Sequence, residues 1–433
     1  MLKVFVENKS NRLLYALDLV LNQVGGLKFK VADNTEDLHP DDHVINYSGR
    51  NIQGSFQIHP HGLLFEKDVQ IGDIPFSYRS DKMLVSVFPT EFDDLGFDVF
   101  AASFYIATRY EEYRKFEADE HGRYTSKHSI QSKIGILKRP IINIWVKELK
   151  KLLEKKWNIT FPESRSFRTI NTIDVDVAFA YLAKGAVRGT GGLGKEILKG
   201  DFSSAKNRIN TMTNKEKDPL DTYDFIKETA TNNGVESIFF LLLGDYKKPY
   251  DTPNDFTSVV YRELVQRLAS FSQIGIHPSY NSYLNEGKLL KEIDRLKALT
   301  KLENVIARKH FLRLSIPDSY RLMEKVGITD DYTMGYADQI GFRAGLCTPF
   351  KPFDVLQDKV LNIQVHPFAY MDGTLREYLH LSADEAVKEV EFLKREVKNV
   401  NGEFIGIWHN TSLTDTGEWE GWREVYEVGL GNS

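Results

Sequence analysis

Acidic side chains follow one apolar run of this sequence directly, in a pattern that suits hydrolytic chemistry. The run Thr169–Ile173 is followed by Asp174 and Asp176. If the run is a strand, both carboxylates lie on one face, because side chains alternate along a strand. Two carboxylates this close repel each other, so a cation, a proton or an arginine must accompany them. One carboxylate can then hold a metal while the other accepts a proton. The alternative is that an aspartate caps the following turn.

Imidazole and guanidinium groups follow three later apolar runs. His277 ends one run, Arg308 and His310 follow the next, and His409 follows the last. Packing alone favours apolar residues at such places, whereas hydrolysis requires groups that bind a metal or transfer a proton. His277 by itself is equally well explained as a turn residue with satisfied hydrogen bonds. Together, these residues predict a hydrolytic site.

Strand-like and helix-like segments alternate after residue 166, which predicts a mostly parallel sheet with helical crossovers, either open or closed into a barrel. In both cases the chemistry is expected at the carboxyl ends of the strands. The expected strands are Thr169–Ile173, Ser237–Leu243, Ile274–His277, Val305–Ala307, Leu361–Val365 and Phe404–Trp408. The expected helices are Thr222–Asn232, Asp255–Phe271, Glu286–Leu299, Ser319–Val326 and Ala383–Lys398.

The preceding part of the chain mixes strand and helix patterns and ends in the polar, proline-containing segment Asn158–Ser166, which is typical of a linker. We therefore predict a smaller α/β domain in residues 1–160 and a second domain in residues 161–433. The expected strands of the first domain are Leu2–Val6, Lys28–Val31, His43–Tyr47 and Ser55–Ile58. Its expected helices are Arg12–Val24, Asp98–Tyr113 and Pro140–Trp157.

The composition excludes several classes of protein. The 433 residues include 56 Lys and Arg and 61 Asp and Glu, a net charge of −5 that gives no general attraction to nucleic acid or to an anionic membrane. The longest apolar run, Ile238–Leu243, is far shorter than a membrane span. The first apolar run meets Glu7 and is too short for a signal peptide, so a cytoplasmic location is expected. A single cysteine, Cys347, excludes an intrachain disulfide and a four-thiolate zinc site, and its apolar setting predicts a core position.

Other short motifs do not support a function. Gly189–Lys195 matches the start of a phosphate-binding P-loop, but Glu196 stands where a hydroxyl is required and no strand precedes it, so a flexible surface loop is expected. The pair His59 and His61 has no carboxylate or thiolate close in sequence, and a structural role is expected. The common serine-hydrolase elbow and zinc-protease helix motifs are absent from the sequence.

The order of the motifs from Phe167 to the C-terminus resembles the polysaccharide deacetylases, carbohydrate esterase family four: an aspartate pair, a G-x-H, an arginine motif, and a late apolar strand that ends in histidine. The resemblance implies an α/β fold, a distorted (β/α) barrel of about seven strands. It also implies a divalent metal, of the zinc type, held by one aspartate and two histidines.

Carried over residue by residue, the resemblance makes Asp174 the base that activates water and Asp176 a metal ligand. His277 is then the first metal histidine, and His409 is the general acid. The valine between the two aspartates, which are adjacent in the family, leaves an exchange of their roles open.

The remaining positions depart from the family pattern. Arg308 would steady the base, and Arg343 is a second candidate for that role. The second metal histidine of the family falls on Asn281, a poorer zinc ligand, and His310 is the residue that can replace it.

The N-terminal part resembles a domain of unknown role that accompanies such deacetylase-like domains in some bacterial proteins. The resembling parts are the expected helix Asp98–Tyr113 and the turn Asp119–Arg123. The resemblance implies no chemistry for this domain.

The sequence therefore predicts metal-assisted removal of an N-acetyl group from a carbohydrate substrate. Two alternatives remain: a glycosidase that uses Asp174 with Asp372, and a barrel that has lost its second metal histidine at Asn281 and only binds a glycan. Four aromatic residues are candidate sugar platforms, although core packing explains each of them equally well, namely Tyr280, Tyr336, Trp408 and Phe368. The identity of the sugar and the oligomeric state do not follow from the sequence.

Overall fold

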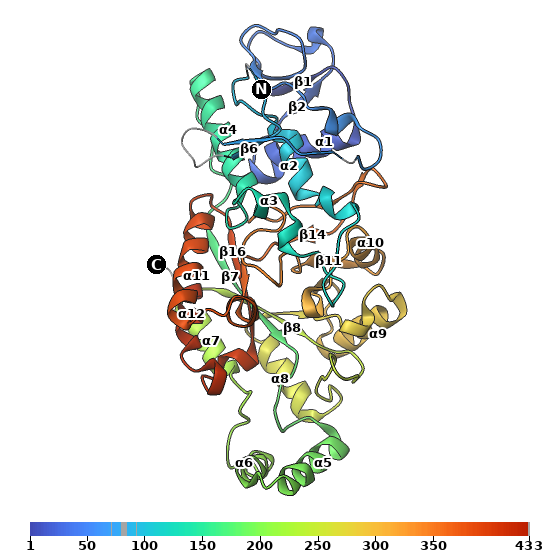
Figure 1. Ribbon diagram of the computed structural model, residues 1–433, viewed down its shortest axis with the longest axis vertical. Coiled ribbons are helices and arrows are strands. Elements are labelled where there is room, and N and C mark those ends of the chain that lie inside the picture. Colours follow the sequence, from blue (N-terminus) through green and yellow to red (C-terminus); the bar gives the residue numbers. More distant parts are fainter. Residues whose placement is uncertain (71, 79–84, 92, 432–433) are drawn as a thin grey trace.

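A four-stranded parallel sheet with helices packed around it forms the N-terminal part of the protein (Figure 1). The computed structural model describes residues 1–431 except 71, 79–84 and 92. The strand order is β2-β1-β3-β4, and all four expected strand regions contain a strand. The bounds are β1 Leu2–Val6, β2 Lys30–Ala32, β3 His43–Tyr47 and β4 Phe56–Gln57. A two-stranded antiparallel ribbon, β5 (Phe76–Tyr78) and β6 (Val85–Val87), lies outside this sheet.

Three of the four α-helices described in this part, α1, α2 and α3, begin at side-chain caps. Ser10 accepts a hydrogen bond from the backbone of Leu13 at the start of α1, and Asp98 caps α2. All nine residues of α2 are buried, as expected for a helix that is apolar all round. The bounds are α1 Asn11–Leu17, continued by a π-helical segment to Val24, α2 Val99–Ala107, α3 Ile130–Lys133 and α4 Ile141–Trp157.

The expected helix Asp98–Tyr113 is shorter than the apolar pattern indicated. It ends at Ala107, because Arg109 adopts a left-handed backbone conformation with φ of 56°, and a 3₁₀ turn follows over Tyr110–Tyr113. Left-handed φ is uncommon outside glycine and asparagine. The Arg109 side chain accounts for it, since the guanidinium is held in a buried network described below.

The second sheet contains eight parallel strands in the order β14-β11-β10-β9-β8-β7-β16-β15. This order follows the sequence and then wraps round, so that the last strands lie beside the first, as in a barrel that is open between β14 and β15. The bounds are β7 Arg168–Val175, β8 Glu236–Leu241, β9 Gln273–Ile276, β10 Val305–Ala307, β11 Ile328–Asp331, β14 Gln364–Val365, β15 Tyr370–Met371 and β16 Glu403–His409. The predicted α/β fold with a barrel-like sheet is confirmed, with eight strands in place of seven.

Helices lie alongside this sheet and connect its strands (Figure 1). The best capped is α11, where Ser382 and Glu385 form a reciprocal capping box. The bounds are α5 Gly185–Leu198, α6 Phe202–Met212, α7 Tyr223–Asn232, α8 Val259–Ala269, α9 Glu286–Thr300, α10 Asp318–Lys325, α11 Ala383–Lys398 and α12 Trp422–Leu430. A short hairpin, β12 (Phe353–Asp354) and β13 (Lys359–Val360), leads into β14.

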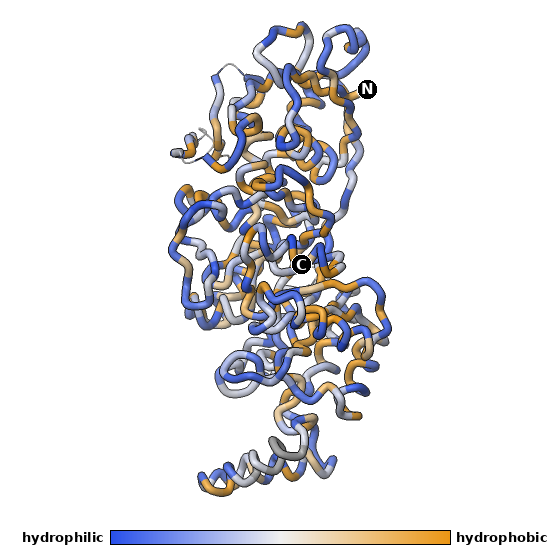
Figure 2. The backbone as a smooth tube through the Cα atoms, turned by 90° about the vertical axis from the view of Figure 1, so that its right-hand side faces the viewer, coloured by the Kyte–Doolittle hydropathy of each residue, from blue (hydrophilic) through white to orange (hydrophobic). Residues whose placement is uncertain are grey.

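The segment Gly189–Lys195 is not the flexible loop that its glycines suggested. It lies inside α5, which forms a helical hairpin with α6 at the end of the molecule opposite the N-terminal sheet (Figures 1 and 2). Each glycine costs a helix about 1 kcal/mol relative to alanine. The helix forms despite this cost, and Glu196 of α5 forms an ion pair with Arg208 of α6.

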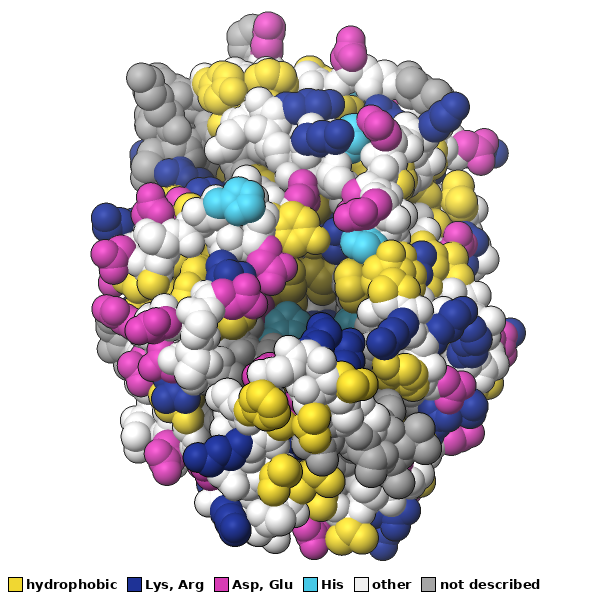
Figure 3. Space-filling model, turned by 60° about the horizontal axis from the view of Figure 1, so that its bottom comes forward, with side chains coloured by type: hydrophobic (Ala, Val, Ile, Leu, Met, Phe, Trp, Pro, Cys, Tyr) yellow, Lys and Arg dark blue, Asp and Glu magenta, His cyan; other side chains and the backbone are white. Residues whose placement is uncertain are grey.

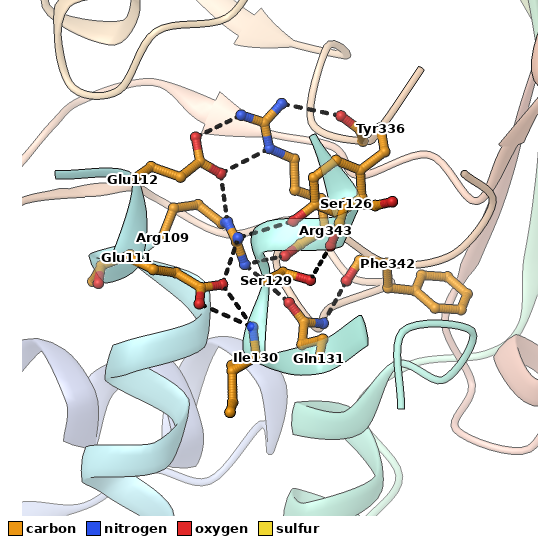
Figure 4. A network of polar contacts seen from close by, with 12 residues as sticks. Arg109, Glu111, Glu112, Ser126, Ser129, Ile130, Gln131, Tyr336, Phe342 and Arg343 are labelled. Carbon is orange, nitrogen blue, oxygen red and sulfur yellow. Dashed lines mark hydrogen bonds and ion pairs between the residues drawn. The ribbon is translucent and has the colours of Figure 1, made fainter. Parts of the chain in front are cut away.

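A buried polar network joins the N-terminal part to the barrel (Figure 4). Nε and Nη2 of Arg343 donate to the two oxygens of Glu112 at 2.9 and 2.6 Å, and Nε of Arg109 donates to the same carboxylate at 2.8 Å. Arg109 also donates to Gln131 and to the hydroxyl of Tyr336. Burial alone would raise the pKa of Glu112, but the two guanidinium groups outweigh it and lower this pKa.

The hydrophobic core continues across the same boundary, with buried residues of α1, α2 and α4 in one cluster with those of the barrel. The division of the chain at residue 160 stays a prediction. Within the described part of the chain, none of the helices combines the length and the apolar character that crossing a bilayer requires.

The buried network gives a prediction about stability. Replacement of Glu112 by Ala leaves Arg343 and Arg109 buried without their carboxylate, which should lower the free energy of unfolding by about 3–5 kcal/mol. The matched control is Glu286→Ala, since Glu286 pairs with Lys325 on the surface and should contribute less than about 1 kcal/mol. Urea denaturation of both variants measures the difference, and equal losses would contradict the importance of the network.

Candidate functional site

A pocket opens at the carboxyl ends of the barrel strands and encloses about 350 Å³. Figure 3 shows it as a hollow with histidine side chains at its floor. Five of the residues expected to do chemistry line it: Asp174, Asp176, His277, His310 and His409. They come from four different strand ends, which the parallel sheet brings to one edge. The register places His409 directly beside Asp174 on the neighbouring strand.

Asp174 lines this pocket and forms an ion pair with Arg308. Asp174 is buried, and its Oδ1 accepts a hydrogen bond from Nη1 of Arg308 at 2.9 Å. Arg308 is fully buried, donates through Nε to the carbonyl of Tyr332, and lies over the ring of Phe240. Of the two candidate arginines, Arg308 is therefore the one that contacts Asp174. Its position neutralises the Asp174 carboxylate while Oδ2 remains directed toward His277, 3.7 Å from its Nε2.

Asp176 faces three imidazoles. Its Oδ1 lies 3.2 Å from Nε2 of His277, and its Oδ2 lies 3.4 Å from Nε2 of His310 and 3.7 Å from Nε2 of His409. Burial would raise the pKa of Asp176, but the histidines outweigh burial and hold this pKa well below its usual range. Ligand atoms of Asp176, His277 and His310 all lie within 4.8 Å of one another, close enough to share one metal ion.

The two histidines of this group are each oriented through the ring nitrogen that points away from Asp176. Nδ1 of His277 donates to the carbonyl of Arg308 at 2.5 Å, and Nδ1 of His310 lies 3.2 Å from Oδ1 of Asp251. Both Nε2 atoms are thus left toward the pocket, the arrangement that metal-binding histidines require. Burial lowers the pKa of His310, but Asp176 and Asp251 outweigh it and raise the pKa to about 9.

Asp251 is a residue that sequence reasoning missed. It is fully buried and accepts hydrogen bonds from the backbone of Tyr280 and from both the backbone and the side chain of Asn281. No apolar strand precedes it, so its sequence context carried no signal. Only the fold reveals that it positions His310.

His409, the third imidazole near Asp176, is held by a buried carboxylate. Its Nδ1 lies 2.9 Å from Oδ1 of Asp372, and its backbone N–H donates to Oδ2 of the same residue. Burial lowers the pKa of His409, whereas Asp372 first and then Asp176 and Asp174 raise it, to about 10. An imidazole held in this way stays protonated at neutral pH and can donate a proton into the pocket.

Two of the expected site residues lie elsewhere. Arg343 does not contact Asp174; its guanidinium is bonded to Glu112 and to the carbonyl of Gly335, so it belongs to the network of Figure 4. Asn281 lies behind His310 and donates to Asp251. The sequence could not separate these candidates, because spacing along the chain does not show which strand end a side chain faces.

A turn of the N-terminal part reaches the same pocket. Arg123, which lines the pocket, donates to the carbonyl of Phe311 at 3.0 Å, to the hydroxyl of Tyr378 at 3.0 Å and to Asp119. The carbonyl of His121 accepts a hydrogen bond from Arg313. The turn Asp119–Arg123 therefore holds the segment that follows His310, in which Phe311 has φ of 58°. A residue in this conformation requires such support.

The expected aromatic platforms are mostly part of the core. Tyr336, Trp408 and Phe368 are almost fully buried, which corrects three of the four candidates, and Tyr280 is half-buried beside the pocket. The aromatic residues that line the pocket are Phe311, Tyr378 and Trp419. Cys347 is buried, and burial raises its pKa, as expected for a core residue.

Comparisons with other proteins give the following similarities. A family of unknown function, DUF7033, matches residues 2–158. A solved structure from Mycobacterium smegmatis, provisionally described as a polysaccharide deacetylase, is 13% identical, with a TM-score of 0.39, over 63% of this chain and 85% of the other. A GH138 enzyme targeting pectin rhamnogalacturonan II is 9% identical, with a TM-score of 0.24, over 99% of this chain and 63% of the other. No curated protein matches the sequence. At these TM-scores neither solved structure supports an argument about activity.

The contact between Asp372 and His409 predicts a pH dependence in the metal-free protein. A histidine whose pKa is raised by folding contributes stability that is complete below about pH 6.5 and is lost as pH rises toward about 10. Asp372→Asn removes the carboxylate that raises the His409 pKa most, so this pKa should fall and the loss of stability should move to lower pH. Histidine NMR titration with a chelator present measures the pKa.

The control for this titration is Asp330→Asn. Asp330 contacts His366, outside the pocket, so this variant should change the titration of His366 and leave that of His409 unchanged. An unchanged His409 titration in Asp372→Asn would show that the observed contact does not hold the proton on His409.

Proposed function

We propose that this protein is a metal-assisted hydrolase that removes an N-acetyl group from a carbohydrate. The observation that carries the proposal is the arrangement around Asp176: two imidazoles complete a ligand group with it, while Asp174 and His409 flank that group with their own buried partners. Such an arrangement separates three tasks, namely metal binding, proton removal and proton donation, among different side chains. Asp176, His277 and His310 suit metal binding, Asp174 suits proton removal, and His409 suits proton donation.

The residues fit a divalent metal. Oδ1 of Asp176 is buried and, although His277 is close, it has no hydrogen-bond donor among the described residues. A cation beside this oxygen would remove the cost of leaving it unpaired. Two imidazoles and one carboxylate with positions left for water are a common zinc set, so zinc is the metal we expect. When bound, the metal would lower the pKa of water and polarise the acetamide carbonyl.

His310 supplies the ligand that Asn281 could not. The family resemblance placed the second metal histidine at Asn281, but the imidazole that reaches Asp176 comes from the end of the next strand, β10. Asp251 orients this imidazole, and Asn281 in turn holds Asp251. The substitution at Asn281 is therefore compatible with a retained metal, which weakens the case for a barrel that only binds a glycan.

In this proposal, Asp174 and His409 transfer the protons. Asp174 keeps one oxygen toward the pocket and would accept the proton of the attacking water, with Arg308 holding the carboxylate in place. His409, kept protonated by Asp372, would give a proton to the departing amine. The water oxygen bonds to the carbonyl carbon, the carbon–nitrogen bond breaks, and acetate and a free amine result. Because Asp176 faces the histidines, the structure favours Asp174 as the base.

A sugar suits the pocket walls. The cavity is large enough for a small ligand and combines aromatic faces, Phe311, Tyr378 and Trp419, with polar groups at the floor. Apolar sugar faces pack on aromatic rings, while hydroxyl groups require the polar partners. Asp372, the second carboxylate of the glycosidase alternative, accepts hydrogen bonds from the backbone of His409 and of Gly373 and contacts the His409 ring, which weakens that alternative.

Metal binding can be tested at His310. The variant His310→Ala removes one of three ligands and should weaken zinc binding by more than about tenfold, measured by competition with a chelating dye. The matched control is His366→Ala, which removes another buried histidine and should leave zinc binding unchanged. Asn281→Ala should have a smaller effect than His310→Ala, because Asn281 acts through Asp251. The reverse order of these two effects would make Asn281 the ligand.

The chemical step can be tested at Asp174. Asp174→Asn keeps the shape of the side chain but cannot accept a proton, so acetate release from N-acetylated oligosaccharides should fall by about 10²–10⁴-fold. Zinc content should stay the same, since Asp176, His277 and His310 remain. Loss of zinc together with activity would exchange the roles of the two aspartates.

Wild-type protein that holds zinc but releases no acetate from any N-acetylated glycan would contradict the proposed reaction. Release of shorter oligosaccharides with the acetyl groups intact would instead identify a glycosidase.

A further inference from the structure

The helical hairpin of α5 and α6 is set apart from the body of the protein (Figures 1 and 2). It is inserted after β7, at the edge of the sheet where Asp174 and Asp176 lie. The hairpin is an ordered element: Arg208 of α6 forms an ion pair with Glu196 of α5 at 2.6 Å, and its guanidinium lies over the ring of Tyr181 at 4.7 Å. Its helices are thus fixed to each other and to the segment that leaves the barrel.

Apolar side chains are exposed where the two helices meet. Leu198 is 89% exposed, Phe202 70% and Ile197 50%, and these three residues flank the turn between the helices. Ile209 and Met212 are also exposed and lie seven and ten residues after Phe202, so they continue the same helical face. Exposed apolar side chains that form one contiguous face indicate a surface that another partner covers.

The charge of this segment differs from that of the whole protein. Residues 184–217 contain eight Lys and Arg but three Asp and Glu, a net charge of +5, so the rest of the chain carries −10. The exposed lysines Lys195, Lys199 and Lys206 lie beside the apolar face, and none of them forms an ion pair with another described residue. The overall charge of −5, which indicated no attraction to an anionic membrane, therefore conceals a basic hairpin.

An apolar face bordered by lysines is complementary to an anionic bilayer. Apolar side chains enter the boundary between headgroups and acyl chains, while lysines extend their charged ends to the phosphates. A second copy of the protein fits less well, because pairing two hairpins would bring two basic segments together. Figure 3, in which this end of the molecule comes forward, shows hydrophobic side chains with Lys and Arg around them, on the face that also bears the hollow of the pocket.

We propose that the α5–α6 hairpin binds the surface of an anionic membrane through Ile197, Leu198 and Phe202, with Lys195, Lys199 and Lys206 contacting lipid phosphates. Binding of this kind needs no membrane-spanning segment. Because the hairpin leaves the barrel at the carboxyl end of β7, it would hold the pocket end of the barrel toward the bilayer. The proposal does not depend on the reaction proposed above.

Vesicle co-sedimentation of the full-length protein tests this proposal. The protein should sediment with vesicles of phosphatidylcholine and phosphatidylglycerol mixed equally, should bind vesicles of phosphatidylcholine alone at least about tenfold more weakly, and should be released by high salt. The double variant Leu198→Ser, Phe202→Ser and the triple variant Lys195→Glu, Lys199→Glu, Lys206→Glu should each lose most of the binding.

The matched control is Leu356→Ser, which removes an exposed leucine outside the hairpin and should leave vesicle binding unchanged. All replaced side chains are exposed, so thermal unfolding of the variants should match the wild type. Failure of the wild type to bind mixed vesicles, or equal binding by the hairpin variants, would overturn the proposal. The protein could instead self-associate in the absence of vesicles, and the double variant could abolish this self-association. That result would identify a second copy of the protein as the partner and would also overturn the proposal.

Discussion

Two carboxylates at the end of one buried strand must be neutralised, and the site depends on how the neighbouring strands meet this need. Asp174 is matched by Arg308 from β10, and Asp176 by the imidazoles of His277 and His310. The parallel sheet makes this possible, because the carboxyl ends of its strands meet at one edge. Each positive group is in turn held by a second partner, such as Asp251 behind His310 and Asp372 behind His409. Neutralising the two carboxylates thus involves the groups that contact them and also the carboxylates behind those groups.

The N-terminal part contributes to this edge as well as packing against it. Arg123 of the turn Asp119–Arg123 forms part of the pocket wall and fixes the carbonyl of Phe311, next to His310. The buried ion pair of Glu112 with Arg343 joins the same two parts of the chain at a second place. The region that matches a family of unknown function therefore supports the pocket directly. Substitutions in this region would therefore alter the site through the backbone that follows His310.

Charge is distributed unevenly over the molecule, and the pocket differs from the α5–α6 hairpin in how its charged groups are paired. At the pocket, Arg308 is paired with the buried Asp174 and His409 with the buried Asp372, whereas the lysines of the α5–α6 hairpin are exposed beside apolar side chains. A total charge of −5 averages these regions and describes neither of them. Local charge, taken with the exposure of its neighbours, is the better guide to which surfaces meet a ligand or a partner.

The local pattern of apolar residues was sufficient to predict most strands and helices of the barrel. The apolar runs and their alternation with helices predicted β7, β8, β9, β10 and β16 and the helices α7 to α11, because burial on a sheet or a helix face leaves a periodic signal in the chain. The pattern did not reveal β11, which carries two aspartates, or β15, which is two residues long. It also misjudged Gly189–Lys195, since helix formation there depends on neighbours and not on the glycines alone.

The sequence by itself determined which strand ends carry the ionisable groups, because each follows an apolar run within a few residues. Asp174, Asp176, His277, His310 and His409 could be selected in this way. Only the tertiary structure decided which of them face one another: that Arg308 and not Arg343 lies beside Asp174, and that His310 and not Asn281 lies beside Asp176. The physical reason is that these contacts join residues more than a hundred positions apart, through strand order and register, which no local pattern of the chain records.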